Sequence, residues 1–334
     1  MEAREHEDAP VRRPRIAAVV PVFRERSRVT AVLGRFGPEV SRIYVVDDAC
    51  PEQTGRMVEE TCSDPRIRVL FHEVNRGVGG ATMTGYAQAL ADGADVVLKV
   101  DGDGQMDPAL IPLLVAPILR GEADYVKGNR FHNLDGLSSM PTVRLLGNAV
   151  LSFVTKISTG YWNVFDPNNG FTAIHAAVLR ELPLDKIDQR FFFESDMLFR
   201  LNTLQAVVID VPMRAVYKTE ESKLKVSQAL VDFSIRHARN ALRRVVYNYY
   251  LRNFNVASLQ ILFGILFVAF GTTFGIVKWI ESARTGDAAT TGTVMLASLP
   301  VLVGVQLLLA FASYDMANVP ARPIHPRLRV SPPG

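Results

Sequence analysis

Residues 99 to 107 read KVDGDGQMD, in which two acidic side chains follow an apolar run and stand in a glycine-containing turn. Asp101 and Asp103 are two positions apart at the end of a predicted buried strand. An unpaired buried carboxylate is unfavourable, so a cation is needed to neutralise the pair. Mg²⁺ or Mn²⁺ binds few protein carboxylates and completes its shell with phosphate oxygens and water. We therefore predict a divalent-metal and diphosphate site here, with an exposed acidic turn as the alternative.

Four short β-branched segments alternate with helical patterns in the first hundred residues, namely 16–22, 43–46, 67–71 and 96–100. This alternation predicts an α/β fold with a mainly parallel sheet and helices on both faces. Such sheets bind ligands beyond the carboxyl ends of their strands. We expect the polar clusters at three of these ends to converge on one crevice. The clusters are Pro21, Phe23 and Glu25; Asp47 and Asp48; and Asp101 and Asp103.

The segment 75–81, NRGVGGA, leads into a helical pattern. Its glycines would let backbone N–H groups and a helix N-terminus approach a phosphate. The segment is not a G-x-G-x-x-G motif after the first strand, so a dinucleotide site is the weaker interpretation. A role in capping the helix is favoured over it.

Short polar motifs become frequent after residue 125, and loops as dense as these usually carry function. The motifs are 128–131, 140–144, 166–171 and 191–196. Between two of them, residues 145–161 predict a helix with a long apolar face. That face would lie either at a membrane surface or in the protein core.

Taken in order, these motifs resemble the family 2 glycosyltransferases of GT-A fold, over about residues 15 to 220. The matching motifs are PVFRE at 21–25, VVDD at 45–48, NRGVGGA at 75–81 and DGDGQ at 101–105. With DPNNGF at 166–171 and a C-terminal hydrophobic pair, the chain resembles the polyprenyl-phosphate hexosyltransferase branch. That branch includes dolichyl-phosphate mannose synthases and bacterial undecaprenyl-phosphate glucosyltransferases. The resemblance implies a Rossmann-like GT-A domain.

The resemblance also implies a nucleotide-sugar site. It would be formed by Pro21, Phe23, Glu25, Asp48, Gly77, Asp101 and Asp103. Asp48 matches the position that contacts a uracil or guanine base. Asp101 and Asp103 would hold Mg²⁺ or Mn²⁺ on the donor diphosphate, with Gln105 as a third ligand. A metal held there stabilises the negative charge that develops on the leaving diphosphate.

A lipid phosphate is the acceptor that the resemblance implies. The residues that match its grip are Arg130 and Arg144, supported by Ser138 and Asn148. Such a phosphate is mostly ionised at neutral pH, so it needs positioning by arginine more than deprotonation. A strong general base is therefore optional for this acceptor.

Two carboxylates are candidates for a further catalytic role. Asp166 resembles the aspartate near the sugar in the polyprenyl branch, and Gly170 in its loop permits close backbone approach. Asp196 belongs to FFFESDML at 191–198, which resembles the acidic motif that supplies the base in other family 2 enzymes. We favour Asp166 for positioning the sugar or acceptor and keep Asp196 as the alternative base. Glu194 would equally cap the following helix.

The chain departs from the family pattern at several positions. Phe23 and Arg24 stand where a tyrosine and an asparagine are frequent, and Cys50 stands near the place of a serine. The motif ending at Phe171 lacks the arginine that often follows in mannose synthases. This last difference favours a UDP-sugar over GDP-mannose as the donor.

Two apolar stretches near the C-terminus, 257–280 and 293–313, are each long enough to cross about 30 Å of hydrocarbon. Neither has the polar face of a globular helix, so two transmembrane helices are favoured over buried core helices. Basic residues flank the pair, while the connecting loop offers mainly Arg284. The flanking residues are Arg236, Arg239, Arg243, Arg244 and Arg252, then Arg322, Arg327 and Arg329. The catalytic part and both termini are predicted to face the cytoplasm.

These patterns divide the 334 residues into five parts. Residues 1–14 are a charged N-terminus, predicted to be disordered and to contain no signal peptide. Residues 15–225 form the cytoplasmic catalytic domain, and 226–256 an amphipathic juxtamembrane helix. Residues 257–313 contain the two transmembrane helices, and 314–334 a cytoplasmic tail.

The net charge of +3 is too small to indicate a nucleic acid partner, and the clustered arginines indicate a lipid bilayer instead. Cys50 and Cys62 lack metal-ligand spacing and are predicted to be free thiols. Lateral association through Gly264, Gly271 and Gly275 would make a homo-oligomer, but these glycines would equally ease packing within the hairpin.

Three functions are compatible with these residues. The favoured one is an inverting enzyme that moves a hexose from a nucleotide sugar to polyprenyl phosphate on the cytoplasmic leaflet. The second is a membrane glycosyltransferase whose acceptor is a carbohydrate or polymer hydroxyl, which requires a base. The third is a catalytically silent membrane subunit, and the intact DGDGQ motif argues against it.

Overall fold

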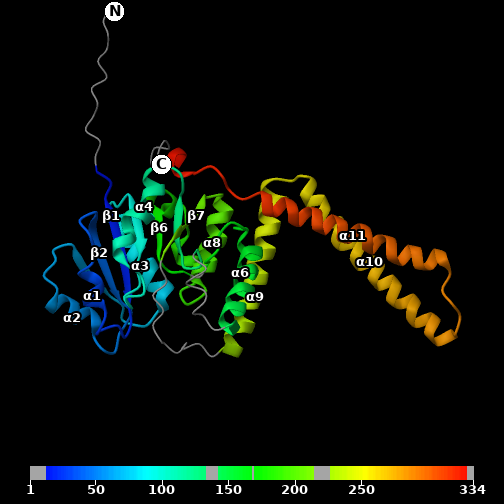
Figure 1. Cartoon of the computed structure of the whole chain (residues 1–334), viewed down its shortest axis with the longest axis horizontal. Coiled ribbons are helices and arrows are strands. Elements are labelled where there is room, and N and C mark those ends of the chain that lie inside the picture. Colours follow the sequence, from blue (N-terminus) through cyan, green and yellow to red (C-terminus); the bar gives the residue numbers. More distant parts are fainter. Residues whose placement is uncertain (1–12, 133–141, 168, 214–225, 329–334) are drawn as a thin grey trace, which may run out of the picture.

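The computed structural model of the chain describes residues 13–132, 142–167, 169–213 and 226–328 (Figure 1). Within these residues, its globular part is built on a seven-stranded sheet of order β3-β2-β1-β4-β6-β5-β7. The strands are β1 Ile16–Val22, β2 Val40–Asp47, β3 Ile67–Phe71, β4 Val96–Lys99, β5 Tyr125–Asn129, β6 Thr172–His175 and β7 Val208–Pro212. The predicted bounds of β1 and β3 are confirmed, and β2 is longer than predicted.

Most strand pairs in the sheet are parallel. β1 pairs in parallel with β2 and β4, β2 with β3, and β5 with β7. Only β6 among the described strands is antiparallel, to both β4 and β5. The predicted α/β fold with a mainly parallel sheet is therefore confirmed, and the reversed β6 is a feature that the sequence did not predict.

Helices cover both faces of the sheet and give it two cores. Ala18 and Val20 of β1 point into one core with α1, α2 and α4, while Ala17 and Val19 point into the other with α3, α7 and α8. This is why every residue of β1 is buried. The helices and short 3₁₀ turns are α1 Val29–Leu33, α2 Thr54–Thr61, α3 Gly77–Ala91, η1 Pro108–Leu110, α4 Ile111–Leu119, α7 Ala176–Arg180, η2 Leu184–Lys186 and α8 Phe193–Leu204.

Two long helices, α6 Thr142–Thr159 and α9 Val226–Val246, pack on each other and on α8. After α9, a π-helical turn, η3 Tyr247–Arg252, leads into α10 Val256–Thr285, which pairs with α11 Thr291–Ala317. Figure 1 shows α10 and α11 as a hairpin that extends away from the globular part. Both helices are long and apolar enough to cross a membrane, and few of their residues are buried. The alternative of two core helices is therefore wrong.

Glycines allow the two hairpin helices to approach closely. A Cβ at Gly264 would lie 2.8 Å from Leu308, and one at Gly304 would lie 2.8 Å from the backbone nitrogen of Val268. Gly271 and Gly275 likewise face Ala297 of α11. The structure thus uses Gly264, Gly271 and Gly275 within the hairpin, which is the second of the two roles predicted for them.

The root of the hairpin is fixed to the globular part by a buried cluster of four side chains, here called the root cluster. Arg244 donates to both carboxylate oxygens of Asp315, at 2.6 and 3.0 Å. Tyr249 donates to Asp315 at 2.6 Å and Trp162 at 2.9 Å. Because Trp162 follows α6 and Asp315 belongs to α11, this cluster sets where the hairpin leaves the domain.

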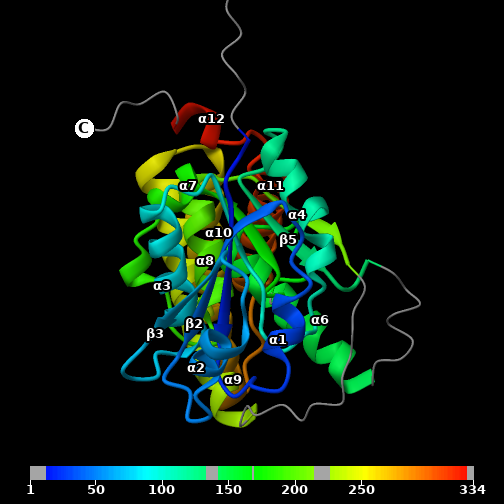
Figure 2. The ribbon, with the colours of Figure 1, turned by 90° about the vertical axis from the view of Figure 1, so that its left-hand side faces the viewer.

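Beyond α11 the chain returns to the globular part, and its short helix α12, His325–Leu328, lies next to α7 (Figure 2). The Asp124 carboxylate accepts hydrogen bonds from the backbone nitrogens of Ile324 and His325. The His325 ring stacks on His175 with 4.3 Å between centroids. The first part of the predicted tail is therefore bound to the domain up to residue 328.

Candidate active site

A pocket of about 480 Å³ lies beyond the carboxyl ends of β1, β2 and β4 and is here called the donor pocket. All seven residues that the resemblance assigned to the nucleotide sugar line it. They are Pro21, Phe23, Glu25, Asp48, Gly77, Asp101 and Asp103. Each of the three predicted clusters is therefore represented in one crevice, although Asp47 is not among the described residues that line it. Lining residues that the sequence did not assign to this site include Asn75, Lys99, Arg190, Phe191 and Glu194.

The turn after β4 places Asp101 and Asp103 on the wall of the donor pocket. Asp103 accepts a hydrogen bond from the backbone nitrogen of Gln105 at 2.9 Å, and Gln105 is not among the described residues that line the pocket. Two carboxylates suit Mg²⁺ or Mn²⁺, which prefer oxygen ligands. No group of three or more His, Cys, Asp or Glu able to hold a metal occurs in the described residues. Two carboxylates alone do not complete the shell of such a cation, so a metal held by Asp101 and Asp103 would need further oxygen ligands, such as those of a diphosphate.

A buried lysine supports this turn from behind. Lys99 is 1 % exposed, and its Nζ lies 2.5 Å from Asp101 Oδ1 and 3.9 Å from Glu194 Oε1. Burial lowers the pKa of Lys99, but the charges of Asp101 and Glu194 outweigh it, and the net effect raises this pKa. Burial likewise raises the pKa of Glu194 above its ordinary value. A charged lysine thus lies between two carboxylates of the donor pocket.

The two aspartates after β2 hold backbone around the pocket. Asp47 accepts from the backbone nitrogens of Cys50 at 2.7 Å and Gly55 at 2.6 Å. Asp48 accepts from the backbone nitrogens of Arg76 at 2.8 Å and Gly77 at 2.7 Å, at the start of α3. The first backbone N–H groups of α3 are thus bound by Asp48, and the N-cap residue, Arg76, makes no side-chain capping hydrogen bond. A helix-capping role for the NRGVGGA segment itself stays a prediction. Contact between Asp48 and a nucleobase stays a prediction. Both cysteines, Cys50 and Cys62, are free thiols as predicted.

The glycines of α3 also bring a distant loop over the pocket. A Cβ at Gly79 would lie 2.4 Å from the carbonyl oxygen of Asp188, and Gly80 donates to the carbonyl of Gln189 at 2.9 Å. Gly77 has φ +87, a conformation that favours glycine. This close approach places the neighbouring Arg190 and Phe191 on the pocket wall. The glycine-rich segment was the only sequence signal of this contact.

The loop that contains Asp166 contacts both the turn of Asp101 and Asp103, here called the metal turn because a metal is predicted there, and Arg130 of the predicted acceptor site. Asp166 is 2 % exposed and accepts from Arg130 Nε at 2.7 Å and Nη2 at 3.0 Å. In the same loop, a Cβ at Gly170 would lie 2.3 Å from Lys99 Nζ and 2.7 Å from Asp101. Gly170 therefore permits the close approach that the sequence predicted. Asp166 orients the Arg130 guanidinium by a bidentate ion pair.

The structure does not bring Asp196 into the donor pocket. Among the described residues, its carboxylate accepts from Arg200 Nε at 3.0 Å, from the backbone nitrogen of Asp188 at 3.1 Å and from Asn240 at 3.3 Å. It therefore ties α8 to α9 and holds the loop before α8. Glu194 is the acidic residue of this motif that lines the pocket.

The structure describes little of the other three predicted acceptor residues. Ser138 lies outside the described residues, and so do the side chains of Arg144 and Asn148, whose backbone belongs to α6.

The described part of α6 has polar residues on its buried face and apolar residues on its exposed face. The buried face contains Thr155, Ser158 and Thr159, whereas the exposed face contains Val150, Phe153 and Ile157, which are 56 %, 55 % and 39 % exposed. A helix of a soluble domain has the reverse arrangement.

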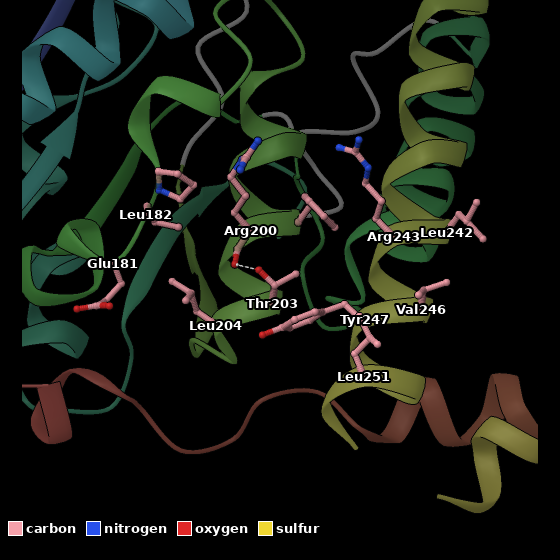
Figure 3. Close-up of a pocket in the computed structure, with 12 residues that line it drawn as sticks. Glu181, Leu182, Arg200, Thr203, Leu204, Leu242, Arg243, Val246, Tyr247 and Leu251 are labelled. Atoms are coloured by element: carbon pink, nitrogen blue, oxygen red, sulfur yellow. Dashed lines mark hydrogen bonds between the residues drawn. The ribbon is translucent and has the colours of Figure 1, made fainter. Parts of the chain in front are cut away.

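A second hollow, of about 590 Å³, lies between the segment that follows α7, helices α8 and α9, and η3, and it shares no lining residue with the donor pocket. Figure 3 shows its apolar side chains, including Leu204, Leu242, Val246 and Leu251. The acidic residue among those that line it is Glu181. Without a pair of carboxylates it cannot hold a metal diphosphate, so the smaller donor pocket is the candidate active site.

Comparison with known proteins supports this assignment. The profile of glycosyl transferase family 2 matches residues 17–183. A UDP-N-acetylglucosamine–dolichyl-phosphate N-acetylglucosaminyltransferase of Methanococcus voltae is 28 % identical over 234 residues, 66 % of this chain and 92 % of that protein. An undecaprenyl-phosphate mannosyltransferase of Micrococcus luteus is 31 % identical over 225 residues, 66 % of this chain and 91 % of that protein.

Solved structures resemble the globular part. A glucosyl-3-phosphoglycerate synthase from Mycobacterium tuberculosis, in complex with UDP, superposes with a TM-score of 0.52 at 20 % identity, covering 69 % of this chain and 80 % of that one. The same enzyme with Mn²⁺, UDP-glucose and phosphoglyceric acid gives a TM-score of 0.51. At this identity the likeness concerns the fold, and it confirms the predicted GT-A architecture.

Proposed function

Since this chain belongs to glycosyl transferase family 2, we propose that it transfers a hexose from a nucleotide sugar to polyprenyl phosphate on the cytoplasmic leaflet of a membrane, with inversion at the sugar. One observation carries the proposal. A single loop bonds Arg130 through Asp166 and contacts Asp101 through Gly170, so the metal turn and an acceptor arginine are held by one element. The two named relatives, which act on dolichyl or undecaprenyl phosphate, support the choice of acceptor.

The donor would bind in the pocket of about 480 Å³, with its base toward Asp48 and its diphosphate toward Asp101 and Asp103. A divalent cation held by these two carboxylates, Mg²⁺ or Mn²⁺, would stabilise charge on the leaving diphosphate. The relative named for UDP-N-acetylglucosamine supports a UDP-sugar as the donor. Gln105 lies near enough in the chain to assist, although its side chain is not part of the described pocket wall.

The acceptor phosphate would be positioned by Arg130, whose guanidinium Asp166 fixes in orientation. Arg144, Ser138 and Asn148 are proposed as further contacts. A phosphate oxygen attacks the anomeric carbon from the face opposite the diphosphate, the bond to the diphosphate breaks, and its electron pair leaves with the nucleotide. The ionised phosphate needs no proton removed, so orientation is the main contribution of these residues.

The surface of α6 supports a lipid acceptor. Its exposed Val150, Phe153 and Ile157 would lie in the interfacial region of a bilayer, while its threonines and serine face the protein. Helices α10 and α11 would cross the bilayer, with both termini and the catalytic domain on the cytoplasmic side. Arg144 and Asn148 lie on α6 itself, so this helix would bring the acceptor site to the depth of a lipid phosphate.

A carbohydrate or polymer hydroxyl is the second candidate acceptor, and Glu194 is the observation that favours it. This chemistry needs a base within the donor pocket, and Glu194 lines the pocket with a raised pKa, whereas Asp196 does not line it. Glu194→Gln would then abolish transfer and Arg130→Gln would have little effect. Transfer to a lipid phosphate predicts instead that Glu194→Gln keeps its kcat at saturating Mn²⁺ and that Arg130→Gln raises KM for the acceptor.

The test is a donor screen with the full chain in detergent. Radiolabelled UDP-glucose, UDP-galactose, UDP-N-acetylglucosamine and GDP-mannose would be supplied with a short polyprenyl phosphate and Mg²⁺ or Mn²⁺. We expect one UDP-sugar to label an organic-extractable product that mild acid cleaves. Binding of a donor without any transfer would instead favour a silent membrane subunit.

A further inference from the structure

We propose that Lys99 occupies the cation's place beside Asp101 in the donor-free protein, and that it changes partner to Glu194 when the divalent cation binds. The inference rests on the proposed function only in taking Asp101 as a metal ligand. It assigns to Lys99 a positioning role for which the sequence offered no motif.

The ammonium group of Lys99 lies close to two carboxyl groups. Its Nζ is 2.5 Å from Asp101 Oδ1 and 3.9 Å from Glu194 Oε1, so it has one bonded carboxylate and a second one close by. The Phe193 ring lies 5.2 Å from Nζ and offers a face that favours a cation. A small movement of the ammonium group would exchange one carboxylate for the other.

The surrounding residues restrict the movement of the Lys99 ammonium group. It is 1 % exposed, and the Gly170 backbone lies so close that a Cβ there would be 2.3 Å from Nζ. The carbonyl oxygen of Gly170 accepts from Nζ at 3.5 Å. A second buried lysine, Lys127, bonds the carbonyl oxygen of Asn169 at 2.7 Å and fills the neighbouring position. The ammonium group is therefore confined between Asp101 and Glu194.

The charges around Lys99 favour its position beside Asp101 when no cation is bound and its movement toward Glu194 when one is. Without a cation, the carboxyl groups of Asp101 and Glu194 share one partly buried wall; Lys99 lies beside both of them, and the charge of Lys127 also acts on Glu194. A divalent cation bound to Asp101 repels an ammonium group on the same carboxylate, because two positive charges a few ångströms apart interact strongly in a protein interior. Glu194 supplies the alternative partner, so the lysine can leave Asp101 without becoming an unpaired buried charge.

This exchange has a measurable consequence. Cation binding to the donor-free protein must displace Lys99 with only the two turn carboxylates as ligands, so it is weak. The diphosphate adds ligands and makes the same displacement favourable. The protein should therefore bind Mn²⁺ and a nucleoside diphosphate cooperatively, and Lys99 should be the main reason for the weak binding without nucleotide.

The experiment is a titration of the full chain in detergent with Mn²⁺, followed by electron paramagnetic resonance of the free ion, with and without UDP. Lys99→Met should raise the Mn²⁺ affinity of the nucleotide-free protein about tenfold or more, the size expected when one competing charge is removed. Glu194→Gln removes the second partner. It should lower the Mn²⁺ affinity by about the same factor both with and without UDP, because in either state Lys99 then leaves Asp101 without a second partner.

Matched variants keep the result interpretable. Arg120→Gln removes an exposed cation that pairs with Glu122 and does not line the donor pocket, and it should leave the Mn²⁺ affinity within about twofold. The double variant Lys99→Met with Glu194→Gln keeps the buried charges balanced. It should still bind Mn²⁺ tightly without UDP, and it provides the test if the single methionine variant does not fold.

Two outcomes would overturn the proposal, and one would overturn its premise. Lys99→Met proteins, single or double, that bind Mn²⁺ no more tightly than wild type would show that the lysine does not compete with the cation. An unchanged UDP-bound affinity in Glu194→Gln would show that Glu194 is not its second partner. Asp101→Asn that binds Mn²⁺ as wild type does would refute the metal site, and with it the proposed function.

Discussion

Two ion pairs in this protein, Arg244–Asp315 and Lys99–Asp101, have similar chemistry and different surroundings. At the root cluster, Asp315 is 4 % exposed and receives two bonds from Arg244, one from Tyr249 and one from Trp162. In the donor pocket, the Asp101 side chain keeps 29 % of its surface accessible while it bonds Lys99. The first carboxylate is enclosed by protein donors, and the second faces a pocket with room for a ligand. Burial of charge alone thus does not identify an active site; accessibility of the carboxylate does.

Asp103→Asn, a change in the accessible donor pocket, should have the largest effect of the series, and on turnover. Loss of one turn carboxylate should lower turnover about 1000-fold, because the leaving diphosphate would lose its charge stabilisation. The melting temperature should change little, since the Asp103 carboxylate lines a pocket. Turnover and thermal unfolding measured on one preparation check both statements. Retained turnover would contradict the metal turn.

Arg244→Met should have the next largest effect, and on stability rather than chemistry. Removing one partner of a buried ion pair leaves Asp315 uncompensated and should lower the free energy of unfolding by about 3 kcal/mol. UDP binding in detergent should be unchanged, because the root cluster does not line the donor pocket. Replacing Asp315 by Asn in the same chain should recover part of the loss. A double variant as unstable as the single one would refute this explanation.

His237, which lies between α6 and α9, should make the stability of the protein depend on pH. Burial lowers its pKa from 6.5 to about 4. Its Nδ1 lies 2.8 Å from Ser158 Oγ, and within the described residues its Nε2 has no hydrogen-bond partner. Because the unfolded chain takes up this proton first, stability falls as the pH drops from about 6.5 toward 4, by about 2 kcal/mol at pH 4.5.

The measurement for His237 is denaturant unfolding of wild type and His237→Asn at pH 7 and pH 4.5. The variant cannot take up this proton, so its loss of stability on acidification should be smaller by about 2 kcal/mol. Equal losses in the two proteins would show that His237 is not the group responsible.

Arg130→Gln should have the smallest effect of this series. It tests whether Arg130 binds the acceptor phosphate. It should raise KM for polyprenyl phosphate about tenfold, the size of one lost charge-assisted contact, and change KM for the donor little. Asp166→Asn should produce a similar but weaker change, because it only loosens the arginine. Arg120→Gln, at an exposed arginine paired with Glu122, is the matched control. A large loss of kcat in Asp166→Asn, with an unchanged acceptor KM, would instead assign it a chemical role.

The donor pocket could be predicted from the sequence because its residues stand at strand ends. Local patterns such as 16–22 and 67–71 mark strands, and parallel strands carry whatever follows them to one edge. Asp48, Asp101 and Asp103 therefore converge without any knowledge of side-chain positions. Lys99 carries no such signal, because a lysine at the end of an apolar run is compatible with an exposed strand end.

Other features depend on how elements are oriented or on distant contacts. Glu194 and Asp196 are two positions apart on α8, about 200° around a helix, so only the packing of α8 decides which of them faces the pocket. Arg244 and Asp315 meet across 71 positions of sequence. The reversed β6 is set by the topology of the sheet. None of these is encoded in a local pattern.

The central claim is that the protein transfers a sugar to a lipid phosphate, and the most direct measurement is a competition between two acceptors. A short polyprenyl phosphate and the matching polyprenyl alcohol would be offered together with the preferred UDP-sugar, and the products identified by mass spectrometry. We predict a hexosyl polyprenyl phosphate and no glycosylated alcohol. Sugar on the alcohol, or on neither lipid while the nucleotide sugar is consumed, would contradict the account.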